Sequence, residues 1–185
     1  TFIAYPNNPT GNLFDRDTIT AVIRAAAPGL VVLDEAYLPF ALETWMPQQP
    51  TFPNLLVLRT LSKLGLAGIR LGYLVGHPAY IEQLDKVRPP YNINSLTLAT
   101  TDLMLDFLDL FDAQAASIRA QRARLLTALC SIPKVTAYDS AANFILFGVE
   151  NPDRTYAGLR QRGILVKNLT RMHLLLRGCL RVTVG

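Results

Sequence analysis

The sequence carries little charge and has no long uninterrupted hydrophobic run. Only 17% of its 185 residues are Asp, Glu, Lys or Arg, against roughly 25% in a typical soluble domain, while 50% are hydrophobic. This balance excludes a disordered or fibrous protein. The longest uncharged run, residues 44–58, has 15 residues and contains three prolines, whereas a bilayer-spanning helix needs about 20. We therefore expect a soluble protein with no membrane partner.

Cysteine and histidine are also scarce. Cys130 and Cys179 lie far apart and form no CxxC pair, so we interpret them as buried thiols of a protein from a reducing, cytoplasmic compartment. His77 and His173 have no second ligand at metal spacing, so no metal site is expected. The chain begins at Thr1 with neither an initiator Met nor a signal peptide, which indicates a piece of a longer protein.

The net charge of +4 is too small to indicate a polyanionic partner. Three arginines of a predicted helical stretch, Arg119, Arg122 and Arg124, lie off the apolar positions of that helix. We interpret them as a solvated surface and expect no nucleic-acid partner.

The first part of the chain predicts an α/β fold with a mostly parallel sheet. Strands are expected at residues 2–5, 30–33, 55–58 and 71–75, with a helix capped by Asp15 between the first two. Strand, helix, strand at this spacing favours a parallel sheet with a helical crossover. Only about a dozen residues separate the third strand from the fourth, barely enough for a crossover. The fourth strand is therefore expected to be antiparallel.

The second part predicts a small α+β domain. A helix at residues 78–86 and a break at Arg88-Pro89-Pro90 precede a long helical stretch with apolar residues from Leu108 to Leu129. Strands are then expected at residues 135–138, 144–147, 164–166 and 180–184, with a helix at 152–162. We place the domain boundary at residue 110, giving domains at 1–110 and 111–185.

A polar loop, Asn7-Asn8-Pro9-Thr10-Gly11, directly follows the first strand. Taken alone, these residues are typical of an ordinary turn.

A pair of acids, Asp34-Glu35, ends the second strand and is followed by Ala36-Tyr37. An apolar strand that ends in Asp-Glu is typical of the Walker B element of nucleotide hydrolases. The same acid could instead pair with a protonated ring nitrogen, or cap a helix. These three interpretations stay open at this point.

A lysine flanked by hydroxyls follows the third strand, in Arg59-Thr60-Leu61-Ser62-Lys63, and Arg70 comes seven positions after the lysine. An amine nucleophile beside a phosphate-binding site has this composition, because Lys63 could form a Schiff base while Thr60, Ser62 and Arg70 bind the phosphate. The alternative is a solvated loop lysine.

Together, the order and spacing of these motifs resemble the fold-type I pyridoxal-phosphate-dependent aminotransferases, and among them most closely the histidinol-phosphate aminotransferases. The C-terminal run from Gly178 to Gly185, GCLRVTVG, adds to the resemblance, which covers the whole chain. It corresponds to roughly the second half of the family's chain. The resemblance implies part of a cofactor-binding large domain, followed by a small domain, in a homodimer.

The resemblance also implies roles for individual residues. Lys63 would hold pyridoxal 5'-phosphate as a Schiff base and move the substrate proton, and Asp34 would pair with the ring nitrogen. Asn8 and Tyr37 would contact the phenolic oxygen of the cofactor. The cofactor phosphate would be held by the two hydroxyls and the guanidinium named above, Thr60, Ser62 and Arg70.

Two basic residues are implied to bind the substrates, L-histidinol phosphate and 2-oxoglutarate (or glutamate). Arg181 would take the anionic end of either, since a guanidinium pairs with carboxylate or phosphate in a bidentate manner. Lys167 stands where some relatives have a phosphate-binding arginine. The interval between Lys63 and Arg70 is one residue shorter than in many aminotransferases of this fold.

Other functions fit part of the pattern. An aromatic amino-acid aminotransferase or a threonine-phosphate decarboxylase would use the same scaffold, and an inactive fragment is a further alternative. A nucleotide hydrolase would explain Asp34-Glu35 as Walker B, but the chain has no GxxxxGK[ST] loop and this function leaves Asn8, Lys63 and Arg70 unexplained.

Overall fold

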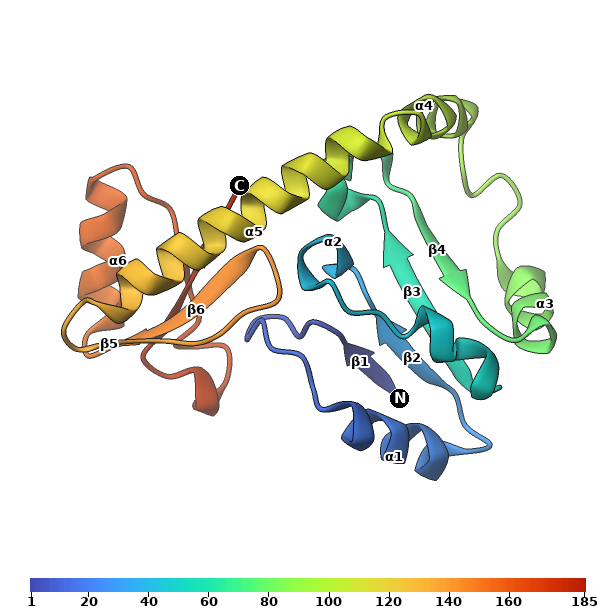
Figure 1. Ribbon diagram of the computed structural model, residues 1–185, viewed down its shortest axis with the longest axis horizontal. Coiled ribbons are helices and arrows are strands. Elements are labelled where there is room, and N and C mark those ends of the chain that lie inside the picture. Colours follow the sequence, from blue (N-terminus) through green and yellow to red (C-terminus); the bar gives the residue numbers. More distant parts are fainter. The chain divides into compact units, whose positions relative to one another are not determined.

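The computed structural model describes residues 1–185 and divides into two compact units (Figure 1). The first unit comprises Thr1–Pro6 and Phe14–Ala115, and the second comprises Asn7–Leu13 and Ala116–Gly185. The boundary falls within the longest helix, α5 (Leu108–Cys130). No helix combines the length and the apolar character that crossing a membrane requires.

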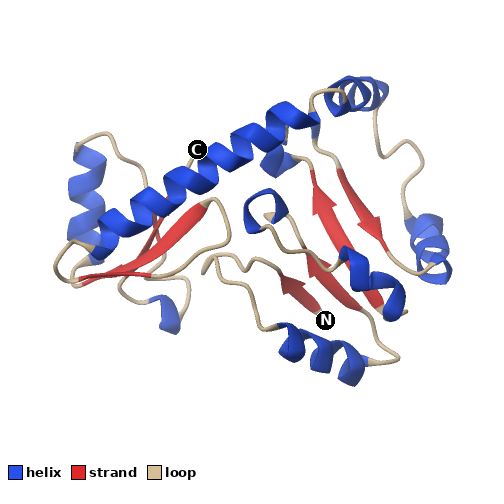
Figure 2. Cartoon of the chain, viewed as in Figure 1, coloured by secondary structure: helices blue, strands red, loops and turns tan.

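The first unit is built on a four-stranded sheet in the order β1 (Phe2–Ala4), β2 (Val31–Asp34), β3 (Leu55–Thr60) and β4 (Gly72–Val75) (Figure 2). The first three strands are parallel, and β4 is antiparallel to β3. The prediction of a mostly parallel sheet with an antiparallel fourth strand is confirmed. The crossover from β1 to β2 contains α1 (Arg16–Ala26), whereas two 3-10 turns connect β3 to β4.

The core of this unit lies between the sheet and the helices beside it. The apolar residues Val31–Leu33 of β2 and Leu55–Val57 of β3 are buried, as expected for parallel strands covered on both faces. Helix α1 buries Ile19 and Ile23, which lie one helical turn apart. After the short helix α2 (Leu38–Ala41), Trp45 is fully buried and lies edge-on to Tyr5.

Asp15 caps the N-terminus of α1, and the stability that this cap contributes depends on pH. The Asp15 carboxylate accepts hydrogen bonds from the Thr18 N–H at 2.8 Å and the Thr18 hydroxyl at 3.0 Å. The backbone hydrogen bond, then the hydroxyl, lower the pKa of Asp15 below its ordinary value of 3.8. Because the pKa is lowered in the folded state, the cap stabilises the protein above pH 3.8 and loses this contribution as the pH falls through the folded-state value.

We therefore expect Asp15→Asn, which keeps an acceptor oxygen but cannot titrate, to lose less stability on acidification than the wild-type protein. The urea midpoints of both proteins, measured at neutral pH and below pH 3.8, give this difference. Equal losses in the two proteins would contradict the prediction.

In the sequence, three helices lie between the strands of the first sheet and those of the second. They are α3 (Pro78–Val87), α4 (Ser95–Leu105) and α5 (Leu108–Cys130), and the last two occupy the stretch that the sequence predicts to be helical. The backbone N–H of Asp106 bonds back to Leu103, and that of Phe107 to Met104, so α4 closes in a tight turn before α5 begins.

The second unit contains an antiparallel sheet in the order β5 (Val135–Ala137), β6 (Phe144–Val149), β8 (Cys179–Thr183) and β7 (Lys167–Asn168), together with helix α6 (Pro152–Gln161). The predicted strand at residues 164–166 is wrong. Ile164 and Leu165 are exposed, and the chain pairs with β8 only from Lys167 onward, because an apolar run by itself does not supply a neighbouring strand edge.

Two further expectations for the second unit are wrong. Arg122 is not simply solvated: it is half-buried, its guanidinium donates to the Ala142 carbonyl at 2.7 Å, and burial, followed by the charge of Arg119, lowers its pKa. Cys130 is exposed because it ends α5, whereas Cys179 lies in the apolar interior of the sheet, where burial raises the pKa of its thiol.

The loop Asn7–Leu13 belongs to the second unit through its contact with the turn before β6. The Ala141 N–H donates to the Gly11 carbonyl at 2.7 Å, and Gly11 has a φ of +82°. A Cβ at Gly11 would lie 2.9 Å from the Ser140 Cβ, too close for a real contact. Glycine is therefore required at this position for two independent reasons.

We expect Gly11→Ala to destabilise the protein by more than the roughly 1–3 kcal/mol of backbone strain alone. Gly163→Ala is the matched control, because Gly163 has a φ of +77° and open space around its missing Cβ. Urea unfolding of both variants measures the difference. Similar losses of stability would show that the Ser140 contact does not constrain Gly11.

Candidate functional site

Polar side chains gather where β2 and β3 end in the first unit. Asp34 is the last residue of β2 and Thr60 the last of β3. Because Asp34 is in register with Leu58, two positions before Thr60, the side chains of Asp34 and Thr60 belong to the same face of the sheet. Open α/β sheets place ligands at this carboxyl end.

Lys63 lies directly beyond β3, in the 3-10 turn η2 (Ser62–Leu64). Its ammonium lies 5.2 Å from the centroid of the Tyr37 ring, a cation–π distance. No carboxylate of the unit pairs with it. The amine is therefore held beside an aromatic face rather than by an ion pair.

The hydroxyls of Thr60 and Ser62 lie 3.0 Å apart at the start of the same turn. The Ser62 N–H donates to the Thr60 hydroxyl at 3.1 Å, and that hydroxyl lies 3.1 Å from the Leu71 carbonyl, which ties the turn to the chain entering β4. Arg70 ends the next 3-10 turn with a φ of +58°, and no carboxylate of the unit pairs with its guanidinium.

In the second unit, Arg181 of β8 contacts Asn8 of the polar loop. A terminal nitrogen of the Arg181 guanidinium donates to the Asn8 side-chain oxygen, and the guanidinium lies 4.7 Å from the centroid of the Phe144 ring. The Nε of Arg181 is buried and has no hydrogen-bond partner. Arg181 is therefore oriented by neighbours that leave its charge unneutralised.

Lys167 of β7 is directly opposite Arg181 in the antiparallel register of β7 and β8. Opposite residues point to the same face, and like charges there repel one another. Lys167 and Arg181 therefore place two like charges on one face of the sheet.

The predicted residues divide between the two units, and contacts join Lys63 to Tyr37, Thr60 to Ser62 and Arg181 to Asn8. The first unit holds Asp34, Tyr37, Thr60, Ser62, Lys63 and Arg70, and the second holds Asn8, Lys167 and Arg181.

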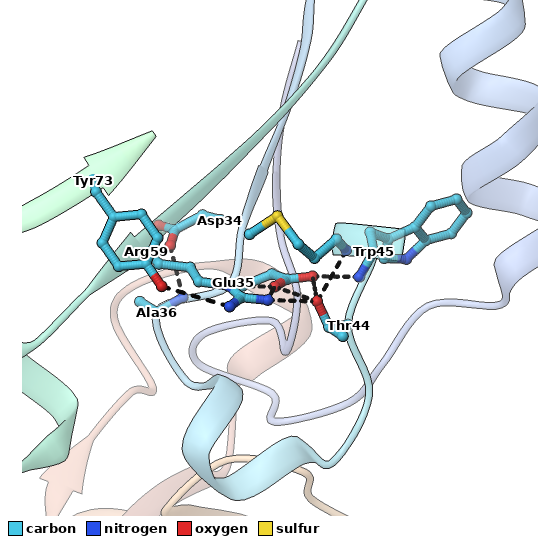
Figure 3. Close-up of polar contacts among 8 residues, drawn as sticks. Asp34, Glu35, Ala36, Thr44, Trp45, Arg59 and Tyr73 are labelled. Carbon is cyan, nitrogen blue, oxygen red and sulfur yellow. Dashed lines mark hydrogen bonds and ion pairs between the residues drawn. The ribbon is translucent and has the colours of Figure 1, made fainter. Parts of the chain in front are cut away.

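A buried charge network behind Asp34 was missed by the sequence analysis (Figure 3). Glu35 is only 1% exposed, and its carboxylate accepts from the Arg59 Nε at 3.0 Å and pairs with the Arg59 Nη2 at 3.0 Å. The same carboxylate accepts from the Trp45 N–H at 2.6 Å and from the Thr44 hydroxyl at 2.8 Å. Every oxygen of Glu35 is therefore satisfied by groups of the protein itself.

Arg59 is held by the same network. Its Nη2 donates to the Thr44 hydroxyl at 2.7 Å, and its Nη1 lies 3.5 Å from the Tyr73 hydroxyl. Burial lowers the pKa of Arg59, but the hydrogen bond with Tyr73 and the charge of Glu35 raise it by more, so the net shift is upward. The sequence offered one signal for this network, the acid Glu35 next to Asp34. Its partner Arg59 could not be identified from the sequence, because the pairing depends on the register of β2 and β3.

The Glu35 network also bears on the nucleotide-hydrolase alternative. A Walker B acid acts on a magnesium-bound water or nucleotide, whereas the Glu35 carboxylate is enclosed by Arg59, Thr44 and Trp45. This geometry favours a structural role for the second acid of the pair.

The comparison with known proteins defines the class. The model of the family "Aminotransferase class I and II" matches residues 2–185, and the chain belongs to this family. Its mixed α/β architecture is that of the fold-type I aminotransferases, as the sequence predicted.

More particular relatives share a single name. The chain is 57% identical over 188 residues to histidinol-phosphate aminotransferase 1 of Ralstonia nicotianae, which covers all of this chain and 50% of that protein. The crystal structure of the histidinol-phosphate aminotransferase from Clostridium acetobutylicum has a TM-score of 0.88 at 22% identity, covering 100% of this chain and 58% of that one. The Sinorhizobium meliloti histidinol-phosphate aminotransferase, solved in complex with pyridoxal-5'-phosphate, has a TM-score of 0.83 at 26% identity, covering 99% and 52%. The chain spans about half the length of these relatives.

Proposed function

We propose that this chain is part of a pyridoxal 5'-phosphate-dependent aminotransferase that transfers an amino group from L-histidinol phosphate to 2-oxoglutarate, giving imidazole acetol phosphate and glutamate. The observation that carries the proposal is the amine of Lys63, which has no carboxylate partner and lies beside Tyr37. It directly follows the hydroxyls of Thr60 and Ser62 at the carboxyl end of the sheet, where β2 ends in Asp34. The relatives at 50% identity and above support the choice of substrate.

The side chains of the first unit fit this cofactor chemically. An aldehyde needs a primary amine that is free of carboxylates, which describes Lys63. A phosphate needs hydroxyl donors and a cation, which describes Thr60, Ser62 and Arg70. A protonated ring nitrogen needs an anion, which Asp34 supplies at the end of β2.

When bound, the cofactor supplies an electron-accepting ring for the electrons released at the substrate Cα. One oxygen of the Asp34 carboxylate accepts a hydrogen bond from the Ala36 N–H at 2.9 Å, which orients the carboxylate. Its second oxygen would be available to the ring nitrogen of the cofactor. Lys63 would hold the cofactor through its Nζ and would serve as the base that moves a proton at the substrate Cα. Tyr37, whose ring lies beside Lys63, would contact the phenolic oxygen of the cofactor.

Arg181 and Lys167 bind the anionic ends of the substrates in this proposal. The guanidinium of Arg181 has no carboxylate partner in its unit, and Lys167 stands opposite it on the same face. A phosphate or a carboxylate relieves the repulsion between these two cations. One site can therefore serve both half-reactions, because each substrate presents an oxyanion.

The organisation of the whole protein is part of the same proposal. Residues 1–110 form part of a cofactor-binding large domain, and residues 111–185 form a small α+β domain. The mostly parallel sheet of the first unit and the antiparallel sheet of the second support this division. The enzyme is proposed to act in the cytoplasm as a homodimer.

The test is an absorption spectrum of the full-length protein loaded with pyridoxal 5'-phosphate, recorded before and after adding L-histidinol phosphate. Phenylalanine and threonine phosphate are the comparison substrates. We expect a visible band that converts fastest with L-histidinol phosphate. Faster conversion by another substrate would support the cofactor assignment but reject L-histidinol phosphate as the preferred substrate. The absence of any band in a folded protein would reject the catalytic proposal.

A further inference from the structure

The buried Glu35–Arg59 pair lies at the carboxyl ends of β2 and β3, on the face of the sheet opposite to Asp34 and Thr60. Side chains alternate along a strand, and residues in register point to the same face. Asp34 and Thr60 share one face, whereas Glu35, which follows Asp34, and Arg59, which precedes Thr60, belong to the other. Each member of the pair is thus the immediate chain neighbour of a proposed cofactor-binding residue.

The pair joins the segments that carry the cofactor residues. Glu35 continues the ladder, since its N–H donates to the Leu58 carbonyl at 2.8 Å, and its carboxylate then crosses to Arg59. The Trp45 N–H and the Thr44 hydroxyl bring the chain after α2 to the same carboxylate (Figure 3). Tyr37 opens α2, so β2, β3 and the segment from Tyr37 to Trp45 meet at one buried ion pair.

The Glu35–Arg59 ion pair is not needed to hold β2 beside β3. The backbone ladder already pairs the two strands over Val31 to Asp34, and burying two charges costs desolvation energy that apolar side chains avoid. A charged fork with directed hydrogen bonds does more than an apolar contact, because it fixes the orientation of both backbones where the ladder ends.

We propose that Glu35 and Arg59 are positioning residues for the cofactor site: their ion pair fixes the end of β2, which presents Asp34, and the end of β3, which presents Thr60 and leads to Lys63. The inference rests on the proposed function. Neither side chain touches the cofactor. Removing the pair leaves the cofactor-binding side chains present but misplaced. Groups that orient metal ligands from behind are typically worth about 10–100-fold in affinity or activity, and we expect an effect of similar size here.

The experiment compares three variants of the full-length protein. Glu35→Gln keeps the shape and acceptor oxygen but loses the charge, and Arg59→Lys keeps the charge but loses the fork. Ile23→Ala is the control, because Ile23 is fully buried in α1 and its truncation destabilises the same unit away from the strand ends. For each variant the urea midpoint of the apoprotein, the dissociation constant of pyridoxal 5'-phosphate and the pH midpoint of the Lys63-dependent absorption band are measured.

We expect Glu35→Gln and Arg59→Lys to weaken cofactor binding by about tenfold or more and to shift the pH midpoint of the band. Ile23→Ala is expected to lower the urea midpoint while leaving both cofactor measurements near wild type. Equal weakening in all three variants, or wild-type binding in a folded Glu35→Gln or Arg59→Lys protein, would overturn the positioning role. A wild-type protein without a Lys63-dependent band would instead overturn the proposed function, and the positioning role with it.

Discussion

Replacing Lys63 by alanine is expected to eliminate the visible absorption band of the cofactor-loaded protein and to lower the rate of amino transfer by roughly 10²–10⁴-fold from lost proton transfer alone. The reason lies in the placement of the amine. Lys63 is held in η2, 5.2 Å from the centroid of the Tyr37 ring, with no carboxylate of the unit pairing with it. No other lysine follows a strand of the first unit's sheet in this way.

Two control variants separate this role from loss of charge. Lys63→Arg keeps the positive charge, but a guanidinium stays protonated and cannot attack an aldehyde, so the band is expected to be absent there as well. Lys86→Ala removes a lysine that lies exposed on α3 and hydrogen-bonds only to Gln83, and it is expected to behave like wild type. Activity of Lys63→Ala within tenfold of wild type would contradict the proposed role.

Arg59→Met is expected to be the most destabilising of the substitutions considered, with a loss of about 3–5 kcal/mol in the free energy of unfolding. Methionine retains much of the apolar stem but removes the guanidinium, so that the Glu35 carboxylate, 1% exposed, stays buried without its counter-charge. Hydrogen bonds from Thr44 and Trp45 remain and offset only part of the penalty.

The double variant Glu35→Gln/Arg59→Met supplies the control for this prediction. With both charges removed, the buried site holds a neutral amide in place of an unpaired anion, so the double variant is expected to be more stable than Arg59→Met alone. Urea unfolding curves of the wild-type protein, both single variants and the double variant close the cycle. A double variant as unstable as the sum of the single variants would show that the two side chains do not interact.

Most of the fold of the first unit could be predicted because local pattern and topology agree there. The apolar runs before Asn7, Asp34 and Lys63 form strands, and the short connection between β3 and β4 correctly predicted an antiparallel strand. The candidate residues follow these strands directly. Their placement at the sheet edge therefore needs only the rule that parallel strands end on the same side.

Prediction failed where the outcome depended on a distant partner. The apolar residues Ile164 and Leu165 are exposed rather than in a strand, because β8 offers its edge only to Lys167 and Asn168. Arg122 is half-buried because the turn before β6 places the Ala142 carbonyl within its reach. Neither neighbour can be identified from the periodicity of the segment itself.

By itself, the sequence determined which side chains are available for chemistry: the amine of Lys63, the acid of Asp34, the hydroxyls of Thr60 and Ser62, and the alternation of strand and helix that places them at the carboxyl ends of β2 and β3. These are local properties, set by residue type and by spacing along a strand. Only the tertiary structure decided that Glu35 pairs with Arg59, that Arg181 contacts Asn8 and that Lys167 stands opposite Arg181. The physical reason is that each of these pairs depends on strand register or loop packing, which the whole core selects and no single segment encodes.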